Sequence, residues 1–278
     1  MIARVLIIAG SDSGGGAGIQ ADVRTVTMLG GHAMTAITAI TAQNTLGVQA
    51  VHPVPTDMVV AQMESVLSDI GVDAVKIGMI GSATTAHAVA DFLSSSFPRK
   101  REPISGAIVQ TKGQEMGSRL RGNDVAEVVP IVFDPVMVAT SGSVLADADT
   151  IAAFERLMRI ATVVTPNIPE LEALGGDGIA KRFGCTVLAK GGHGESATLT
   201  DRLFDAGGVI KQWRSQRIDT LHTHGTGCTL ASALATGLAQ GLGIVSAIDM
   251  ARRYVRDSIK RAPGLGTGHG PMGVPRHA

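Results

Sequence analysis

The sequence predicts an α/β fold in which helices cover both faces of a mostly parallel central sheet. Short apolar runs alternate with amphipathic stretches through most of the 278 residues, and this alternation is typical of successive strand–helix–strand units. The first apolar run, at residues 5–9, contains no polar residue and is bounded by glycine, as expected for a strand buried on both faces. Ligands of such sheets bind beyond the carboxyl ends of the strands.

The spacing of apolar residues gives the expected elements in chain order. The strand at 5–9 leads into a glycine-rich loop at 10–18, and a helix is expected at about 18–29. The next elements are a strand at 33–40, helices at 56–70 and 82–95, and a strand at 73–77. In the second half we expect strands at 129–133, 161–165 and 185–190, helices at about 147–160, 168 onward, 227–240 and 243–261, and an antiparallel hairpin at 195–200 and 207–213.

Residues 98–128 interrupt this alternation. The segment is polar, has no sustained period and falls where a short helix-to-strand connection is expected. A structureless stretch of this length is unusual inside a compact domain. We therefore expect one domain over residues 1–278, with an atypical insertion at about 98–128 that forms a mobile surface loop.

The overall composition excludes several classes of protein. Lys+Arg and Asp+Glu both number 24, for a net charge of +0, and aromatic residues make up only 3%. A basic surplus or a platform of stacked aromatic residues would be expected of a nucleic-acid-binding protein. The two cysteines cannot form a disulfide framework, and neither a signal peptide nor an apolar run of about 18 residues occurs. We therefore expect a cytoplasmic protein without nucleic-acid or membrane partners.

Two glycine-containing segments are candidates for binding an anion. The loop at 10–18 follows a strand, but it fits a dinucleotide fingerprint only loosely and lacks a Walker A lysine, so it is a substrate loop or a structural turn. Residues 224–229 open an apolar helix, whose free N–H groups and dipole favour an anion. The same position should lower the thiol pKa of Cys228, which is a candidate base or nucleophile unless it is an inert buried residue.

Polar residues follow several of the predicted strands. Asn167 and Glu170 come after the strand at 161–165, where they either cap a helix or hold Mg²⁺. Asp134, at another strand end, could supply a second acid. Lys190 precedes a glycine turn, from which it either reaches a phosphate or points to solvent.

Two further polar groups lie at the mouth of the expected cleft. Asp22 belongs to the first helix, beside the glycine loop, and Gln43 follows the second strand. By contrast, Cys185 and the methionines of the predicted helices are more plausibly core residues.

In combination, these segments resemble one known family. They read AGSDSGGGAGIQAD (9–22), TAQNT (41–45), KIGM (76–79), DPVMV (134–138), TPNIPE (165–170), KGGH (190–193) and HGTGCT (224–229). The chain, apart from 98–128, resembles the hydroxymethylpyrimidine/phosphomethylpyrimidine kinases of thiamine biosynthesis, members of the ribokinase-like superfamily. Each motif is moderately specific, whereas seven in the same order are highly specific. The resemblance implies a three-layer ribokinase-like fold.

The resemblance also implies a reaction and its participants. The expected activity is the ATP-dependent phosphorylation of 4-amino-5-hydroxymethyl-2-methylpyrimidine and then of its monophosphate, with Mg²⁺, in a homodimer. The resemblance leaves the need for a monovalent cation open. The residues implied to hold the pyrimidine are Gly10, Asp22, Thr41, Gln43 and Met79. Those implied for catalysis are Gly225, Thr226, Gly227 and Cys228, with Lys190, Asn167 and Thr165 for ATP and its phosphates and Glu170 and Asp134 for the metal.

Alternative functions remain open at this point. A pyridoxine/pyridoxal kinase of the same superfamily would share nearly every motif. The chain departs from the family pattern at 98–128 and between Glu170 and Lys190, where glycines replace most of a helix. A pyrimidine-binding homologue with impaired catalysis is therefore a further alternative. A Rossmann dehydrogenase is disfavoured because the glycine loop fits the dinucleotide fingerprint only loosely.

Overall fold

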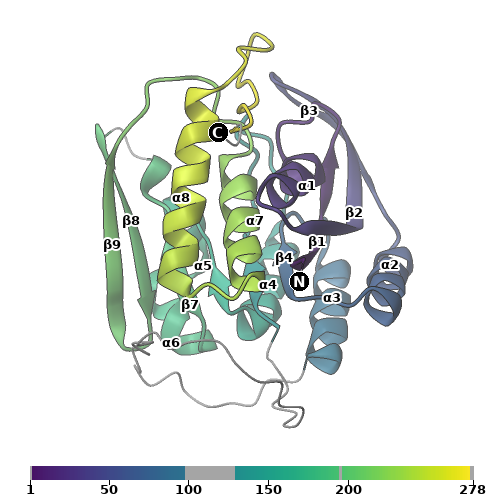
Figure 1. Cartoon of the computed structure of the whole chain (residues 1–278). Helices are drawn as coiled ribbons and strands as arrows, with labels where there is room; N and C mark the ends of the chain where they lie inside the picture. The colour runs from purple at the N-terminus through teal and green to yellow at the C-terminus, as the bar shows by residue number, and fades with distance from the viewer. Residues whose placement is uncertain (1, 98–128, 194–195, 276–278) are drawn as a thin grey trace, which may run out of the picture.

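The computed structural model describes residues 2–97, 129–193 and 196–275 (Figure 1). The predicted insertion at 98–128 lies outside the described residues. The described chain forms one nine-stranded sheet in the order β3-β2-β1-β4-β5-β6-β7-β8-β9. The strands are β1 (Arg4–Asp12), β2 (His32–Asn44), β3 (Gly47–Pro53), β4 (Ala74–Ile77), β5 (Ile131–Phe133), β6 (Val163–Val164), β7 (Thr186–Ala189), β8 (Thr198–Asp205) and β9 (Gly208–Gln216).

The sheet is parallel at its centre and antiparallel at both edges. Strands β2, β1, β4, β5, β6 and β7 run parallel to one another. The hairpin partner β3 closes one edge, and the β8–β9 hairpin closes the other. The predicted α/β class with a mostly parallel sheet is therefore confirmed, as is the antiparallel hairpin.

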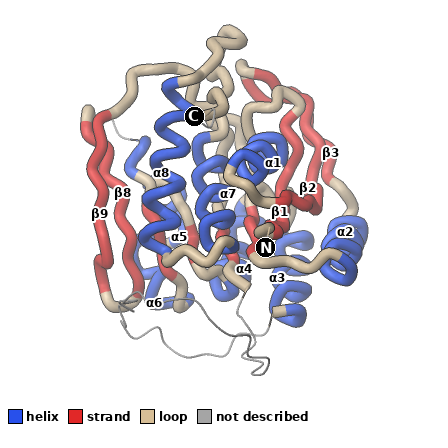
Figure 2. Tube along the Cα trace, in the orientation of Figure 1, coloured by secondary structure: helices blue, strands red, loops and turns tan. Residues whose placement is uncertain are grey.

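Helices cover both faces of this sheet and give the three layers seen in Figures 1 and 2. One face carries α2, α3, α4, α5 and α6, and the other carries α1, α7 and α8; each set packs on its own cluster of buried apolar side chains. The helices are α1 (Gly18–Met28), α2 (Thr56–Asp69), α3 (Ala83–Ser96), α4 (Ala148–Ile160), α5 (Ile168–Leu174), α6 (Ile179–Phe183), α7 (Thr226–Ala239) and α8 (Ile244–Lys260).

Two elements were not predicted from the sequence. The edge strand β3 occupies residues that were left as a connection, and β2 extends to Asn44 to pair with it. The short helix α6 lies between Glu170 and Lys190, where the sequence indicated that most of a helix was missing. Its residues Ile179, Ala180 and Phe183 are buried, so this part of the chain still contributes to the core.

The strand order places a switch point next to β1. From β1 the chain first adds β2 on one side and later adds β4 on the other. The connections diverge there, which leaves a crevice at the carboxyl ends of the strands. The glycine loop after β1 and the start of α7 both lie at this end of the sheet.

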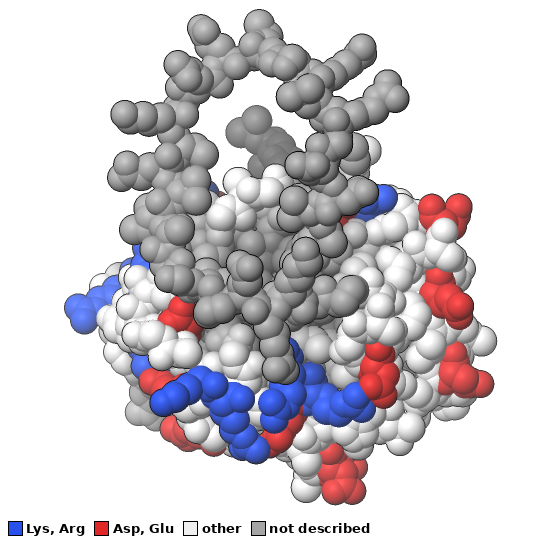
Figure 3. Space-filling view, turned by 90° about the horizontal axis from the view of Figure 1, so that it is seen from below, with Lys and Arg blue, Asp and Glu red and all other residues white. Residues whose placement is uncertain are grey.

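The surface and the helices give two further observations. Figure 3 shows Lys and Arg side chains beside Asp and Glu side chains on one face of the molecule. Among the described residues, no helix combines the length and the apolar character needed to cross a membrane.

Candidate active site

A cavity of about 960 Å³ lies at the carboxyl ends of the parallel strands. Gly10 and Asp12 of β1, Met79 after β4 and Asp134 after β5 contribute to its wall. The start of α7 supplies another part of the same wall. The cavity thus joins both sides of the switch point.

Most of the residues predicted for the site line this cavity. They are Gly10, Thr41, Gln43, Met79, Asp134, Asn167, Glu170, Lys190, Gly225, Thr226, Gly227 and Cys228. Asp22 and Thr165 are not among the residues that line it, and both side chains are fully buried. Their expected contacts with ligand groups stay predictions.

Asp22 contacts protein groups instead of facing the cleft. Its carboxylate lies 2.7 Å from Nζ of Lys76 and accepts a hydrogen bond of 2.7 Å from the hydroxyl of Ser232. The helix α1 places Asp22 on its inner side, where β4 and α7 cover it. The Asp22 carboxylate is thus bound by Lys76 and Ser232, and its expected pairing with a pyrimidine stays a prediction.

Lys76 is a cavity-lining cation that the sequence analysis did not single out. Its side chain is fully buried and ends beside Asp22. Burial alone would lower the pKa of Lys76, but Asp22, Cys228 and Asp134 together outweigh burial, and the pKa is raised. Lys76 therefore keeps its positive charge. A lysine in an otherwise apolar strand was the available sequence signal.

Thr165 likewise supports another site residue. Its hydroxyl donates a hydrogen bond of 2.9 Å to Oδ1 of Asp134. The same oxygen lies 2.7 Å from Nζ of Lys190, so two groups orient one carboxylate. Thr165 thus orients Asp134, and its expected contact with ATP stays a prediction.

The ion pair between Asp134 and Lys190 lies against the first turn of α7. A Cβ atom built on Gly227 would lie 3.3 Å from Oδ2 of Asp134 and 3.3 Å from Nζ of Lys190. Burial lowers the pKa of Lys190, but Asp134 and Glu170 more than compensate, so the pKa is raised. A positive charge is thus held beside the helix N-terminus.

Glu170 and Asn167 form the capping box at the start of α5. The backbone N–H of Asn167 donates to Oε2 of Glu170, and the N–H of Glu170 donates to Oδ1 of Asn167, both at 2.8 Å. Burial raises the pKa of Glu170, while Lys190 opposes the shift. Glu170 both caps α5 and lines the cavity, which is possible because a carboxylate has two oxygens.

The start of α7 packs tightly onto the glycine loop. Gly225, the N-cap residue, has a φ of 84°, in the left-handed region that favours glycine. A Cβ atom at Gly225 would lie only 2.0 Å from the carbonyl oxygen of Gly16, and one at Gly16 would lie 2.4 Å from Cδ2 of His224. The two loops therefore approach more closely than any side chain would allow.

Cys228 lies in the first turn of α7 and lines the cavity. Burial raises its thiol pKa to about 11, with Lys76 acting in the opposite direction. The expectation that the helix N-terminus would lower this pKa is therefore wrong. Desolvation of the thiolate outweighs the helix dipole and the nearby ammonium.

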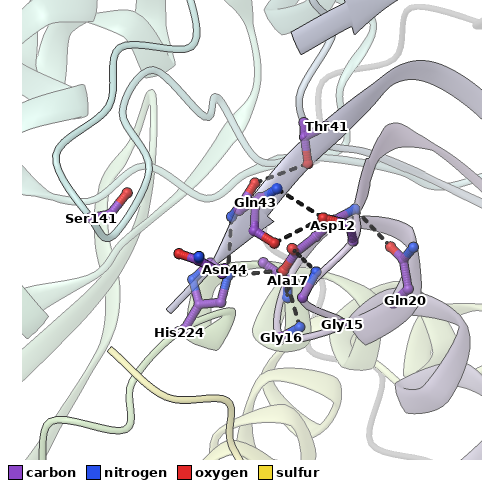
Figure 4. A network of polar contacts seen from close by, with 12 residues as sticks. Asp12, Gly15, Gly16, Ala17, Gln20, Thr41, Gln43, Asn44, Ser141 and His224 are labelled. Carbon is purple, nitrogen blue, oxygen red and sulfur yellow. Dashed lines mark hydrogen bonds and ion pairs between the residues drawn. The ribbon is translucent and has the colours of Figure 1, made fainter. Parts of the chain in front are cut away.

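Asp12 organises the glycine loop, and the sequence analysis missed it. Its carboxylate accepts hydrogen bonds from the backbone N–H groups of Gly14, Gly16 and Ala17 at 2.8, 3.0 and 2.8 Å. Nε2 of His224 lies 2.9 Å from Oδ2 of Asp12 (Figure 4). Burial raises the pKa of Asp12, but these hydrogen bonds outweigh burial and lower it.

The donor set of the cavity fits magnesium rather than a transition metal. Among the described residues, no cluster of three His, Cys, Asp or Glu side chains is suited to hold a metal ion. Asp134 and Glu170 both line the cavity. Mg²⁺ is typically held by one or two carboxylates together with water and substrate phosphates, so this pair is sufficient for it.

Comparison with known proteins places the chain among vitamin kinases. The phosphomethylpyrimidine kinase family matches residues 12–119 and 105–273. The hydroxymethylpyrimidine/phosphomethylpyrimidine kinase of Rhizobium meliloti is 42% identical, over 98% of this chain and 97% of the relative. The thiamine biosynthesis bifunctional protein ThiED of Geobacter sulfurreducens is 44% identical over 96% of this chain, which spans about half (51%) of that protein's length.

Solved structures give the same fold. The phosphomethylpyrimidine kinase of Clostridium difficile has a TM-score of 0.71 at 32% identity and covers 93% of this chain and all (100%) of its own. A Bacillus subtilis pyridoxal kinase, solved with ADP, has a TM-score of 0.77 at 28% identity and covers 99% of this chain and 98% of its own. The predicted ribokinase-like fold is thus confirmed, and the chain belongs to the phosphomethylpyrimidine kinase family.

Proposed function

We propose that this chain transfers a phosphoryl group from ATP to the hydroxymethyl group of 4-amino-5-hydroxymethyl-2-methylpyrimidine, and then a second one to the resulting monophosphate. The observation that carries the proposal is one shared cavity. It joins the start of α7, the Asp134–Lys190 ion pair and the amide of Gln43. A phosphate-binding region and a polar group suited to a heterocycle therefore face the same space.

The start of α7 is suited to the transferred phosphoryl group. The first N–H groups of a helix have no partner within the helix, and the helix dipole adds positive potential there. Of these groups, the N–H of Thr226 donates to the carbonyl oxygen of Thr223 at 3.3 Å. Lys190 supplies a full charge beside Gly227. In phosphoryl transfer through a loose transition state, such positioning and charge stabilisation carry most of the rate.

Asp134 and Glu170 would hold Mg²⁺ in this arrangement. When bound, the ion neutralises negative charge on the phosphates of ATP. Thr165 and Lys190 keep the Asp134 carboxylate oriented, and Asn167 does the same for Glu170. A monovalent cation remains an expectation from the family resemblance.

Cys228 has a limited role as a base in this proposal. A thiol with a pKa of about 11 is protonated at neutral pH. Its position supports a contribution to the shape and hydrogen bonding of the anion hole. Little base catalysis is needed when the alcohol proton leaves late, as in a loose transition state.

The pyrimidine pocket lies on the β1–β4 side of the cavity. The residues proposed to surround the ring are Gly10, Thr41, Gln43 and Met79. A Cβ atom at Gly10 would lie 3.1 Å from Sδ of Met79, which leaves little space for a side chain there. Gln43 supplies the amide group of this pyrimidine pocket, because Asp22 is not among the residues that line the cavity.

Pyridoxal phosphorylation is the second candidate function. Pyridoxal kinases from Bacillus subtilis and Staphylococcus aureus have TM-scores of 0.77 and 0.79 with this chain, although only 28% of residues are identical. The deciding experiment incubates the protein with ATP and each alcohol and measures mono- and diphosphate products separately. Two successive products from the pyrimidine support the main proposal; product only from pyridoxal or pyridoxine supports the second.

A catalytically impaired homologue would behave differently in the same experiment. It would bind the pyrimidine, as measured by calorimetry, without consuming ATP. We further propose a single domain that acts as a cytoplasmic homodimer, as the family resemblance implies. Light scattering of the purified protein tests the dimer.

A further inference from the structure

Gln43 belongs to a hydrogen-bonded chain that begins at Asp12. His224 lies between them: its Nε2 is 2.9 Å from Oδ2 of Asp12 and 3.2 Å from Nε2 of Gln43. On its other side, Oε1 of Gln43 is 3.2 Å from the hydroxyl of Thr41. Figure 4 shows the four side chains clustered beside the glycine loop.

At the Asp12 end of this hydrogen-bonded chain, the charge of the carboxylate determines whether Nε2 of His224 carries a hydrogen. The carboxylate is buried and already accepts three backbone N–H groups, an arrangement that favours its ionised form. An ionised carboxylate only accepts hydrogen bonds. Nε2 of His224 must therefore carry a hydrogen and donate it to Asp12.

The Thr41 end sets a second condition. A hydroxyl has one hydrogen, and that of Thr41 is donated to the carbonyl oxygen of Ser11 at 2.8 Å. The oxygen of Thr41 is then an acceptor toward Gln43. The oxygen of Thr41 therefore requires the NH₂ of Gln43 on its side. The N–H of His224 requires the amide oxygen of Gln43 on the other side.

Both conditions are met by one orientation of the amide. A half-turn of the Gln43 amide places its NH₂ at Thr41 and its oxygen at Nε2 of His224, whose single hydrogen is then shared between Oδ2 of Asp12 and the amide oxygen in a three-centre hydrogen bond. One N–H and one oxygen lone pair of the amide then remain for a ligand. A primary amide used in this way matches an adjacent ring nitrogen and amino group, as in bidentate pairing of glutamine with adenine.

We propose that Asp12 and His224 are positioning residues that orient the amide of Gln43 and thereby select an aminopyrimidine. This inference rests on the proposed function. Asp22 is not among the residues that line the cavity, so we assign the ring nitrogen and the amino group to Gln43. Pyridoxine offers no such pair of adjacent groups, because a methyl-bearing carbon separates its ring nitrogen from its hydroxyl.

The first test measures what the amino group contributes to binding. Calorimetry compares 4-amino-5-hydroxymethyl-2-methylpyrimidine with its analogue lacking the 4-amino group, for the wild type and His224→Ala. We expect the wild type to prefer the amino compound and His224→Ala to reduce that preference about tenfold, as for one lost hydrogen bond. Asp12→Asn should reduce it in the same direction.

A double-mutant cycle and a matched control separate positioning from a general structural effect. In a Gln43→Ala background, His224→Ala should change the preference no further. His222→Asn alters another histidine of the same loop, outside the cavity lining, and should leave the preference unchanged. An equal loss of affinity for both compounds in His224→Ala, with the preference intact, would overturn the proposal.

The second test does not depend on the ligand. In ¹⁵N spectra of the free protein at neutral pH, we expect Nε2 of His224 to be protonated. An unprotonated Nε2 overturns the proposal whatever the substrate is. If the wild type binds neither pyrimidine while Nε2 is protonated, the proposed function fails and the selection of aminopyrimidines fails with it, but the hydrogen-bonded chain stands.

Discussion

Lys76 and Asp22 form an ion pair of 2.7 Å in which neither side chain is exposed to water. Lys76 lines the cavity, whereas Asp22 does not, and Ser232 of α7 donates a further hydrogen bond to Asp22. It thus ties together β4, α1 and α7, three elements that shape the site. Removing one partner of such a pair leaves an uncompensated buried charge.

We therefore expect Asp22→Asn to destabilise the protein by about 3–5 kcal/mol, since Lys76 would be left without its counter-ion. Urea denaturation followed by circular dichroism measures the free energy of unfolding. Asp57→Asn, at the exposed start of α2, is the control and should change it by less than about 0.5 kcal/mol. An unchanged stability of Asp22→Asn would contradict the role of the pair.

Gln43→Ala should weaken pyrimidine binding by about 1–3 kcal/mol, because polar groups of the ring would lose their partners. The affinity for ATP should remain close to that of the wild type. Isothermal calorimetry with each ligand measures both, and Asn44→Ala at the adjacent exposed position is the control. Equal losses for the two ligands would refute the proposed pocket.

The thiol of Cys228 should react slowly with iodoacetamide at neutral pH. Only the thiolate reacts, and it accumulates as the pH rises toward about 11. Mass spectrometry of Cys185→Ser protein, which retains one thiol, follows the labelling rate. A midpoint near or below the ordinary value of about 8.5 would show instead that the helix N-terminus activates the thiol.

The raised thiol pKa of Cys228 also has a consequence for turnover. Cys228→Ala should lower kcat while pyrimidine affinity changes by no more than a few-fold, because the side chain belongs to the anion hole rather than to the ring pocket. Cys228→Ser, which restores a hydrogen-bonding group of similar size, should recover part of the loss. Wild-type turnover in Cys228→Ala would remove the residue from the catalytic machinery.

Glu170→Gln should raise the Mg²⁺ concentration needed for half-maximal activity by about 10–100-fold, since a carboxylate ligand is replaced by a neutral amide. Activity measured across a magnesium titration gives this value. Glu172→Gln alters an exposed carboxylate on the same helix and serves as the control. Similar magnesium requirements for both variants would exclude Glu170 as a ligand.

Gly225→Ala should abolish activity and lower the melting temperature. The left-handed backbone costs about 1–2 kcal/mol for a residue with a Cβ, and that atom would overlap the carbonyl oxygen of Gly16. Gly178→Ala is the control, because Cβ meets no atom within 4 Å there. Normal activity in Gly225→Ala would mean that the two loops can separate.

The central strands were predictable because burial on both faces leaves an uninterrupted apolar run. Strand β3 gave no such signal: most of its residues are exposed, and it pairs at the sheet edge with β2 alone. Its register is fixed by β2 rather than by a pattern of its own. Edge strands of this kind are recognised only once their partner is placed.

The site residues show a similar limit. The sequence placed Asp22 in the first helix, beside the glycine loop, but only the fold brings Lys76, 54 positions later, against it. Asp12 had a local signal, a carboxylate directly before a run of small residues with free N–H groups. Its second partner, His224, is 212 positions away, beyond the reach of any local pattern.

The close packing of Gly16 against the start of α7 has a consequence for biosynthesis. The wall of the cavity is completed by contacts between the first and last portions of the chain, such as Asp12 with His224 and Asp22 with Ser232, 212 and 210 positions apart. During translation the glycine loop emerges long before its partners. Such distant contacts form late, so phosphoryl transfer should be acquired only after α7 has left the ribosome, and nascent chains arrested before residue 224 should contain a sheet without a functional site.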